Sequence, residues 1–186
     1  MQINRIAGVT MVALLALGLV AVSASAQQRG ADTTSLEGKP APAFSLQTVQ
    51  GKDMDLAKDK GNVVVLDFWA TWCGPCRVSL PHLNELSENK ELAEKGLKVY
   101  AVNLREDKDT AKGYADQNKL TFAIPLDLKG AVAEKYLVQG IPTTVVVGRD
   151  GKIAKVLVGS GKNAELDSAV NDALAAENPR KAAKSG

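Results

Sequence analysis

Apolar residues in this chain gather in short runs of strand length, which alternate with stretches in which they recur every three or four positions. One run, residues 63–69, is apolar apart from Asp67 and is typical of a central strand covered on both faces by helices. The other expected strands are residues 97–104, 122–126, 144–147 and 153–158. Helical spacing is found over residues 80–93, 107–118, 131–137 and 166–174. This alternation predicts an α/β fold with parallel strands in a helix-covered sheet.

Two hairpins are expected beside this alternating region. Apolar residues 43–46 and 54–56 flank the turn residues Gln50-Gly51, which predicts a short hairpin ahead of the main sheet. Near the other end, Arg149-Asp150-Gly151 separates the last two β-rich runs, which predicts that these two strands are antiparallel. The main sheet is therefore expected to be mixed.

Residues 1–26 have the layout of a secretion signal. Arg5 stands in a short polar start, an apolar run extends from Ile6 to Val22, and the small residues Ala24 and Ala26 fit a signal-peptidase site. An uncleaved membrane anchor is the alternative, because an apolar run of about 17 residues is at the lower limit for spanning a bilayer. In both cases the rest of the chain is expected to work outside the cytoplasm, in a bacterial periplasm, where disulfides persist.

The remaining 160 or so residues are expected to form one domain with flexible ends. Residues 27–39 are small and polar and are interpreted as a linker, residues 40–176 as the domain, and residues 177–186 as a solvated tail. The formal charge is +2, and the basic residues are interleaved with acidic ones. This excludes a basic stripe for nucleic acid, and membrane contact is expected only through residues 1–26. No cofactor and no metal are expected.

Both cysteines stand in one stretch, Trp72-Cys73-Gly74-Pro75-Cys76, between the expected central strand and the helical pattern after it. Two thiols with two residues between them can join in a disulfide, and the N–H groups and dipole at a helix start favour the thiolate. Such a short loop adds little stability, so the position indicates thiol–disulfide exchange. Half of a zinc site is the alternative, but the chain has no other cysteine and only one histidine.

Three residues near the dithiol have features of their own. A carboxylate at Asp67 in an apolar strand must be hydrogen-bonded, paired or protonated, which predicts a raised pKa and a functional role. The alternative is an aspartate whose side chain reaches solvent or a loop amide. Pro81 lies inside the helical pattern and predicts a kink about one turn beyond Cys76. His82 lies in a polar helical stretch and is expected at the surface.

An ordered set of residues surrounds the dithiol: Asp67 six residues before Cys73, the stretch from Phe68 to Cys76, Pro81 five residues after Cys76, and Ile141-Pro142-Thr143. This set resembles the thioredoxin superfamily. The secretion signal, the N-terminal hairpin and the extra helix–strand material around residues 108–125 further resemble the extracytoplasmic TlpA/ResA-type thiol-disulfide oxidoreductases. The resemblance implies a thioredoxin-like fold, with a central mixed β-sheet flanked by helices, an N-terminal β-hairpin and a central helix–strand insertion.

The resemblance also implies roles in the site. Cys73 is the nucleophile that attacks a substrate disulfide, Cys76 is the resolving thiol that closes the Cys73–Cys76 disulfide, and Asp67 accepts the Cys76 proton through a water. The residues expected to contact substrate are Trp72, Gly74, Pro75, Ile141 and Pro142. Pro142 is expected to be cis and to face the dithiol, so that the backbone at Ile141 can pair with an extended substrate segment.

Two positions depart from the family pattern. Many TlpA/ResA-type proteins carry a glutamate three residues after the second cysteine, where this chain has Ser79. The lysine that partners the buried aspartate in thioredoxins is replaced here by Ala101. Asp67 is thus the expected acid–base group, and without a nearby cation it is expected to be protonated at rest.

The Gly-Pro interior of the motif and the isoleucine before Pro142 resemble the reducing thioredoxins, whose reduction potential is about −270 mV. The expected function is reduction of disulfides in secreted proteins, with an apocytochrome c as a substrate by family analogy and a membrane electron donor for re-reduction. Two alternatives stay open. One is a copper- or thiol-binding module that uses the two sulfurs and His82. The other is a peroxidase of the same fold, which is disfavoured because Cys76 stands so close to Cys73.

Overall fold

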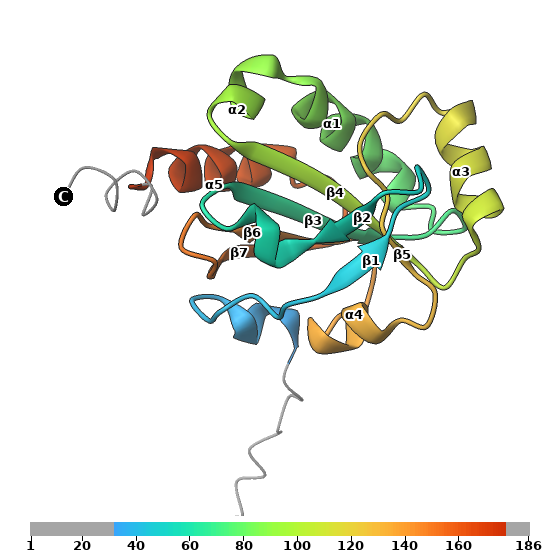
Figure 1. Cartoon of the computed structure of the whole chain (residues 1–186), viewed down its shortest axis with the longest axis horizontal. Helices are drawn as coiled ribbons and strands as arrows, with labels where there is room; N and C mark the ends of the chain where they lie inside the picture. Colours follow the sequence, from blue (N-terminus) through green and yellow to red (C-terminus); the bar gives the residue numbers. More distant parts are fainter. Residues whose placement is uncertain (1–31, 178–186) are drawn as a thin grey trace, which may run out of the picture.

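The computed structural model describes residues 32–177, which fold around a five-stranded mixed sheet (Figure 1). The strand order is β5-β4-β3-β6-β7, with β3 in the centre. The strands are β3 Val63–Trp69, β4 Leu97–Leu104, β5 Leu126–Asp127, β6 Thr143–Val147 and β7 Ile153–Val158. β3, β4 and β5 run parallel, whereas β6 is antiparallel to both β3 and β7. The expected thioredoxin-like architecture is confirmed.

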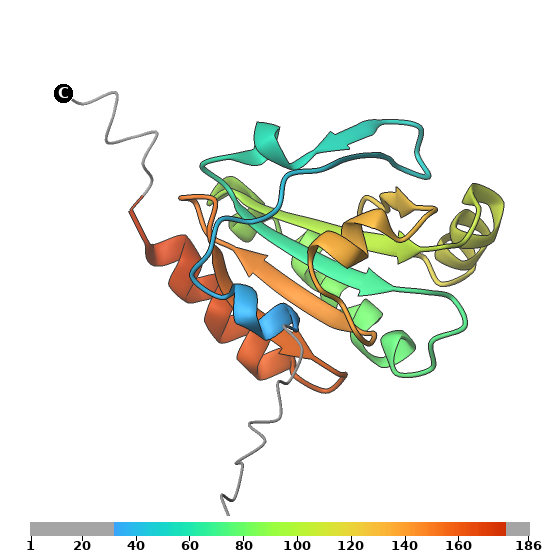
Figure 2. The same cartoon turned by 90° about the horizontal axis from the view of Figure 1, so that it is seen from below.

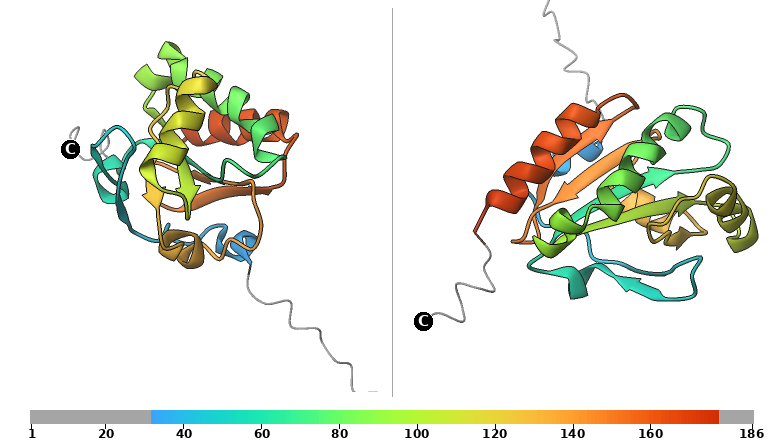
Figure 3. Two further views of the ribbon diagram at one scale, coloured as in Figure 1. Left: turned by 90° about the vertical axis from the view of Figure 1, so that its right-hand side faces the viewer. Right: turned by 90° about the horizontal axis from the view of Figure 1, so that it is seen from above.

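Helices cover both faces of the sheet (Figures 2 and 3). One face carries α1 Cys76–Glu88, α2 Lys90–Glu94, α3 Lys108–Gln117 and α5 Asn163–Ala175; the other carries α4 Ala131–Lys135 and the 3-10 helix η1 Thr33–Leu36. All residues of β3 are buried. Its side chains alternate between two cores, with Val65 and Trp69 on the α1 face and Leu66 and Phe68 on the α4 face. Burial on both faces explains why this strand is a nearly continuous apolar run.

The expected N-terminal hairpin is present. Strands β1 Ser45–Gln47 and β2 Asp53–Asp55 pair in antiparallel register, and the 3-10 helix η2 Leu56–Asp59 follows them. Met54 is buried in the core on the α4 face, and Thr48 bridges to Pro125. The hairpin is therefore attached to the sheet at its β5 edge.

The strand expected over residues 122–126 is wrong in its extent, because β5 comprises only Leu126–Asp127. The preceding residues do run beside β4, whose N–H groups donate to the carbonyls of Ala123 at 3.1 Å and Pro125 at 2.9 Å. A parallel ladder also needs N–H groups that donate back to β4, and Pro125 has none. At Pro125 only the carbonyl group pairs with β4, so the regular hydrogen bonding of a strand is interrupted there.

The helical pattern over residues 80–93 is divided into α1 and α2 rather than continuous. The break is at Asn89, which has extended backbone and whose side chain accepts a hydrogen bond from the Leu92 N–H at 3.1 Å. This is the usual N-cap arrangement, and it starts α2 as a new helix. Pro81 lies inside α1; the kink there stays a prediction.

The linker expected over residues 27–39 is packed against the domain from Thr33 onwards. The buried Thr33 hydroxyl donates to the Leu137 carbonyl at 2.9 Å, and the Gly38 N–H donates to the Ile153 carbonyl at 2.8 Å. The Glu37 carboxylate accepts a hydrogen bond from the Val156 N–H at 2.8 Å. The folded unit therefore begins at η1 and not at residue 40.

The secretion signal or anchor proposed for residues 1–26 lies outside the described residues, as do residues 178–186 of the expected tail. Between residues 32 and 177, the longest helices are too short and too polar to cross a bilayer.

Candidate active site at the dithiol

The dithiol lies at the sheet edge where the parallel strands end. The chain leaves β3 at Trp69 and enters α1 at Cys76, so residues 70–75 form a loop at the carboxyl end of the central strand. Cys73 and Cys76 are joined in a disulfide, with their Cα atoms 5.3 Å apart. The start of β6 lies at the same edge because β6 is antiparallel to β3.

The two sulfurs differ in their access to solvent. Cys76 is fully buried at the start of α1, whereas Cys73 retains 4% exposure. Around Cys73, Gly74 and Pro75 are exposed, and Trp72 is 70% exposed. A partner that approaches from solvent therefore meets these three residues and the Cys73 sulfur before it can reach Cys76.

The backbone at the helix start stabilises negative charge on Cys73. The N–H of Cys76 points at the Cys73 sulfur at 3.2 Å. N–H groups in the first turn of a helix have no intrahelical acceptor, and they lower the pKa of a thiol placed beside them. In the reduced protein this arrangement favours the thiolate at Cys73 over the thiolate at Cys76.

The loop before β6 faces the disulfide. The Ile141–Pro142 peptide bond is cis, and the Ile141 carbonyl oxygen lies 3.7 Å from the Cys73 sulfur. The Pro142 carbonyl accepts a hydrogen bond from the Gly159 N–H at 2.9 Å, which connects this loop to the end of β7. The cis proline opposite the dithiol, which the resemblance implied, is present.

Asp67 is fully buried on the α1 face of the sheet, two residues from Trp69 in β3. Its Oδ1 atom accepts a hydrogen bond from the Thr144 hydroxyl at 2.7 Å, and among the described residues Oδ2 has no partner. Burial raises the pKa of Asp67 to about 7, and the Thr144 hydrogen bond opposes part of this rise. Ala101 is its register partner on β4, so no cation replaces the thioredoxin lysine there. The expected raised pKa is confirmed, and the solvent-reaching alternative is excluded.

Glu106 is a site residue that the sequence analysis missed. Its carboxylate accepts hydrogen bonds from the Thr71 N–H at 2.8 Å and the Thr71 hydroxyl at 2.5 Å, and from the Asn103 side-chain amide at 2.6 Å. It stands in the polar segment between β4 and α3, where a sequence shows only charged residues typical of a solvated loop. Its partner Thr71 is 35 positions away, so no local pattern could have indicated the contact.

Arg77 holds the other side of the same loop. Its guanidinium donates to the Thr71 carbonyl from Nε at 3.2 Å and from a terminal nitrogen at 2.9 Å. It also lies over the ring of Tyr114 in α3, 5.8 Å from the ring centroid, and that ring packs against Trp69. The expected insertion helix α3 is thereby joined to the dithiol loop.

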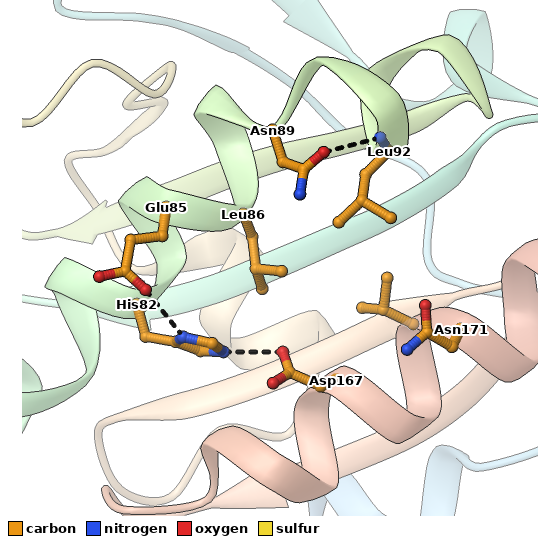
Figure 4. A pocket seen from close by; sticks show the side chains of 8 residues that line it. His82, Glu85, Leu86, Asn89, Leu92, Asp167 and Asn171 are labelled. Atoms are coloured by element: carbon orange, nitrogen blue, oxygen red, sulfur yellow. Dashed lines mark hydrogen bonds and ion pairs between the residues drawn. The ribbon is translucent and has the colours of Figure 1, made fainter.

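His82, which the sequence placed at the surface, is partly buried and bridges α1 and α5 (Figure 4). Nε2 lies 2.8 Å from the Asp167 carboxylate of α5, and Nδ1 lies 3.4 Å from Glu85. The ring borders a pocket of about 360 Å³ between the two helices. Both ring nitrogens face carboxylates, so the imidazole is not directed at the sulfurs as the copper-binding alternative required. Within residues 32–177, no cluster of three or more metal-ligating side chains is found.

Comparisons with known proteins agree with this geometry. The family model described as AhpC/TSA matches residues 38–156. The chain is 41% identical to the thioredoxin-like protein YneN of Bacillus subtilis, over 70% of this chain and 76% of that one. It is 32% identical to the thiol-disulfide oxidoreductase ResA of Geobacillus thermodenitrificans, over 81% and 86% of the two chains. A crystal structure titled as a putative thiol:disulfide interchange protein DsbE from Chlorobium tepidum has a TM-score of 0.69 and 36% identity, covering 74% of this chain and 97% of that one.

Proposed function

The chain belongs to the AhpC/TSA family of the thioredoxin superfamily and is a thiol-disulfide oxidoreductase, and on that premise we propose that it reduces disulfide bonds in secreted proteins. The observation that carries this proposal is the pair of sulfurs at the start of α1, one partly accessible and one buried, opposite the Ile141–Pro142 loop. A dithiol arranged in this way can donate two electrons to a substrate disulfide and return to the disulfide form.

In the first proposed step, the Cys73 thiolate attacks one sulfur of the substrate disulfide. A mixed disulfide forms, the substrate S–S bond breaks, and the other substrate sulfur leaves as a thiolate that takes up a proton. The Cys76 N–H at 3.2 Å from the Cys73 sulfur supports Cys73 as the attacking group, because it stabilises the thiolate before the attack.

In the second step, Cys76 loses its proton and attacks the Cys73 sulfur. The Cys73–Cys76 disulfide forms, the mixed disulfide breaks, and the second substrate sulfur leaves as a thiolate that takes up a proton from solvent. We assign the Cys76 proton to Asp67, through an intervening water. The support for this is the buried Oδ2 atom, which has no hydrogen-bond partner within residues 32–177, and a pKa of about 7, which suits a group that accepts a proton and gives it back near neutral pH.

Substrate binding is assigned to the surface around Cys73. Trp72, Gly74 and Pro75 are exposed beside the sulfur, and the Ile141 carbonyl lies next to it. In the described part of the chain, the Ile141 N–H makes no backbone hydrogen bond, so it can pair with an extended substrate segment as a neighbouring strand would. Pro142 adds a rigid, buried wall behind this position.

The reducing direction rests on the Gly-Pro interior of the motif, which resembles reducing thioredoxins. We place the protein in the periplasm, soluble after removal of residues 1–26 or anchored by them, with a membrane electron donor that restores the dithiol. An apocytochrome c is the substrate suggested by family analogy. A measured reduction potential of about −270 mV would support the reducing direction, and a value of about −120 mV would indicate an oxidant instead.

Location has a direct test. When the full chain is produced in a bacterial host, a periplasmic product shorter by about 26 residues is expected from the small-residue cleavage site. A full-length product in the membrane fraction would favour the anchor, and a full-length cytoplasmic product would contradict export.

The activity itself is tested by reduction of insulin with dithiothreitol as the electron source. The wild-type chain is expected to accelerate insulin reduction, Cys73→Ser to abolish the acceleration, and Cys76→Ser to accumulate mixed disulfides that identify the natural partners. Insulin reduction by Cys73→Ser at the wild-type rate would refute the mechanism.

The peroxidase alternative gains no support from the loop that carries Cys73, because the Thr71 hydroxyl donates its hydrogen bond to Glu106.

A further inference from the structure

A carboxylate from the end of β4 crosses to the loop that carries the dithiol. β3 and β4 are parallel neighbours, so the loop after β3 and the segment after β4 leave the same edge of the sheet (Figure 2). Glu106 uses this proximity to accept two hydrogen bonds from Thr71, two residues before Cys73. One of these hydrogen bonds comes from the backbone of Thr71 and the other from its side chain.

The loop is held on both sides at this one residue. Glu106 binds the N–H of Thr71, and the Arg77 guanidinium binds its carbonyl with two nitrogens. The Cys73 N–H donates to the Ala70 carbonyl at 3.1 Å and closes the turn between them. Because Thr71 is fixed at its N–H and its carbonyl, the turn from Ala70 to Cys73 can place the Cys73 sulfur in few positions.

Glu106 is itself held from the sheet. Asn103 is fully buried on β4, where it is the register partner of Trp69, and its side-chain amide donates to the same carboxylate oxygen that binds the Thr71 N–H. The amide oxygen of Asn103 is buried without a hydrogen-bond partner among the described residues. An unpaired buried acceptor destabilises a fold, so an apolar residue would serve β4 better if packing were all that counted. The residue is explained if its task is to orient Glu106.

We propose that Glu106 is a positioning residue for the dithiol: by fixing Thr71, it holds the Cys73 sulfur against the Cys76 N–H and opposite Ile141. The inference rests on the proposed role of Cys73 as the attacking thiol. Glu106 acts through the geometry of its hydrogen bonds and not through proton transfer, because each of its oxygens is already engaged by a donor from Thr71 or Asn103.

Two variants separate geometry from charge. In Glu106→Gln, the amide oxygen can take the place that binds the two N–H groups, and the amide nitrogen can donate to the Thr71 hydroxyl, which then accepts. The variant therefore removes the charge and keeps the network. Glu106→Ala removes both. Glu134→Gln, on the exposed side of α4, is the matched control, and circular dichroism checks that each variant folds.

The first readout is the pH dependence of Cys73 alkylation by iodoacetamide in the reduced chain, followed by mass spectrometry. With Glu106→Ala the midpoint of this pH dependence is expected to rise toward the ordinary thiol pKa of about 8.5, because the Cys73 sulfur moves away from the Cys76 N–H. With Glu106→Gln it should stay near that of the wild type. A midpoint that falls in both variants would mean that Glu106 acts through its charge, and an unchanged midpoint in both would mean that it only stabilises the fold; each result overturns the proposal.

The second readout is insulin reduction. Glu106→Ala is expected to lower kcat/KM by about tenfold to a hundredfold, the range for a displaced reacting group, and Glu106→Gln to recover most of that loss. If Glu106→Ala does not fold, Thr71→Val takes its place: it removes one of the three hydrogen bonds and should raise the alkylation midpoint by a smaller amount, and no rise would refute the assignment. Alkylation needs no substrate, so it tests Glu106 even if the wild-type chain fails to reduce insulin, which would refute the proposed function instead.

Discussion

Asp67→Asn should make the stability of this protein less dependent on pH. Asp67 is fully buried, its register partner on β4 is Ala101, and Thr144 is its one hydrogen-bond donor among the residues that the structure describes. Asparagine has nearly the same shape and can accept the same hydrogen bond through its amide oxygen. The substitution therefore removes the titration of the carboxyl with little change in packing.

The expected magnitude follows from the pKa. Burial raises the pKa of Asp67 from 3.8 to about 7 in the folded chain, so between these two values the folded protein binds a proton that the unfolded chain releases. Folding stability attributable to this group is fully present below pH 3.8, falls as pH rises, and is lost above about pH 7. The difference between the two pKa values corresponds to about 4 kcal/mol, a large part of the stability of an ordinary domain.

At low pH the two proteins should have similar stability, because protonated Asp67 and the amide of the variant each place a donor at the Oδ2 position, which has no partner in the described part of the chain. Between pH 5 and pH 8 the variant should gain about 3 kcal/mol relative to the wild type. The assay is guanidinium unfolding of both oxidised proteins at several pH values. The oxidised form keeps the cysteines from titrating, and other groups cancel in the difference. A stability difference that stays constant across this pH range would refute the assignment of a raised pKa to Asp67.

Two further predictions concern Arg149, at the end of the sheet opposite the dithiol, and Trp72, beside Cys73. Arg149→Met is expected to lower the free energy of unfolding by about 2 kcal/mol in a denaturant titration, because the buried guanidinium of Arg149 donates to three backbone carbonyls. Lys152→Met, at an exposed position nearby, is the control. Equal stabilities of the two variants would contradict this. Trp72→Ala should raise KM for insulin several-fold and change stability by less than about 0.5 kcal/mol, since the indole is 70% exposed beside Cys73. The Trp72→Ala variant should reduce a small disulfide, such as oxidised glutathione, at the wild-type rate. An equal loss of activity with insulin and with glutathione would argue against substrate contact by Trp72.

Local patterns in the sequence were sufficient for most of the fold. The apolar run at β3 and the hairpin β6–β7 depend on residues that are close in sequence, and both are present as expected. The strand over 122–126 was overestimated because an apolar pattern does not register that Pro125 cannot donate to β4. The expected linker failed for a different reason: η1 is held by contacts to residues more than 100 positions away, and a polar segment carries no sign of them.

In the site, the motif and the family resemblance were enough to find the residues on the chain's own loop, but not those that reach it from elsewhere. The dithiol and Pro142 are recognised by residue type and order. His82 was misplaced because its partner Asp167 is 85 positions away on α5. Glu106 was missed because its surroundings in sequence are charged and polar, whereas its role depends on the parallel pairing of β3 with β4.

The buried carboxyl of Asp67 and the partly buried carboxylate of Glu106 differ in their number of hydrogen-bond donors, and this difference decides what each can do. Within residues 32–177, Asp67 has one hydrogen-bond donor, and its register partner on β4 is an alanine. Its pKa is about 7, so its carboxyl can change protonation during a cycle at neutral pH. Glu106 has three donors, from Thr71 and Asn103, that occupy both of its oxygens. A carboxylate engaged in that way is suited to hold a loop in place. Proton transfer at Cys76 is thus assigned to a residue of β3, and placement of Cys73 to a residue of the segment after β4. The Asp67 and Glu106 variants should therefore alter separate steps of the exchange.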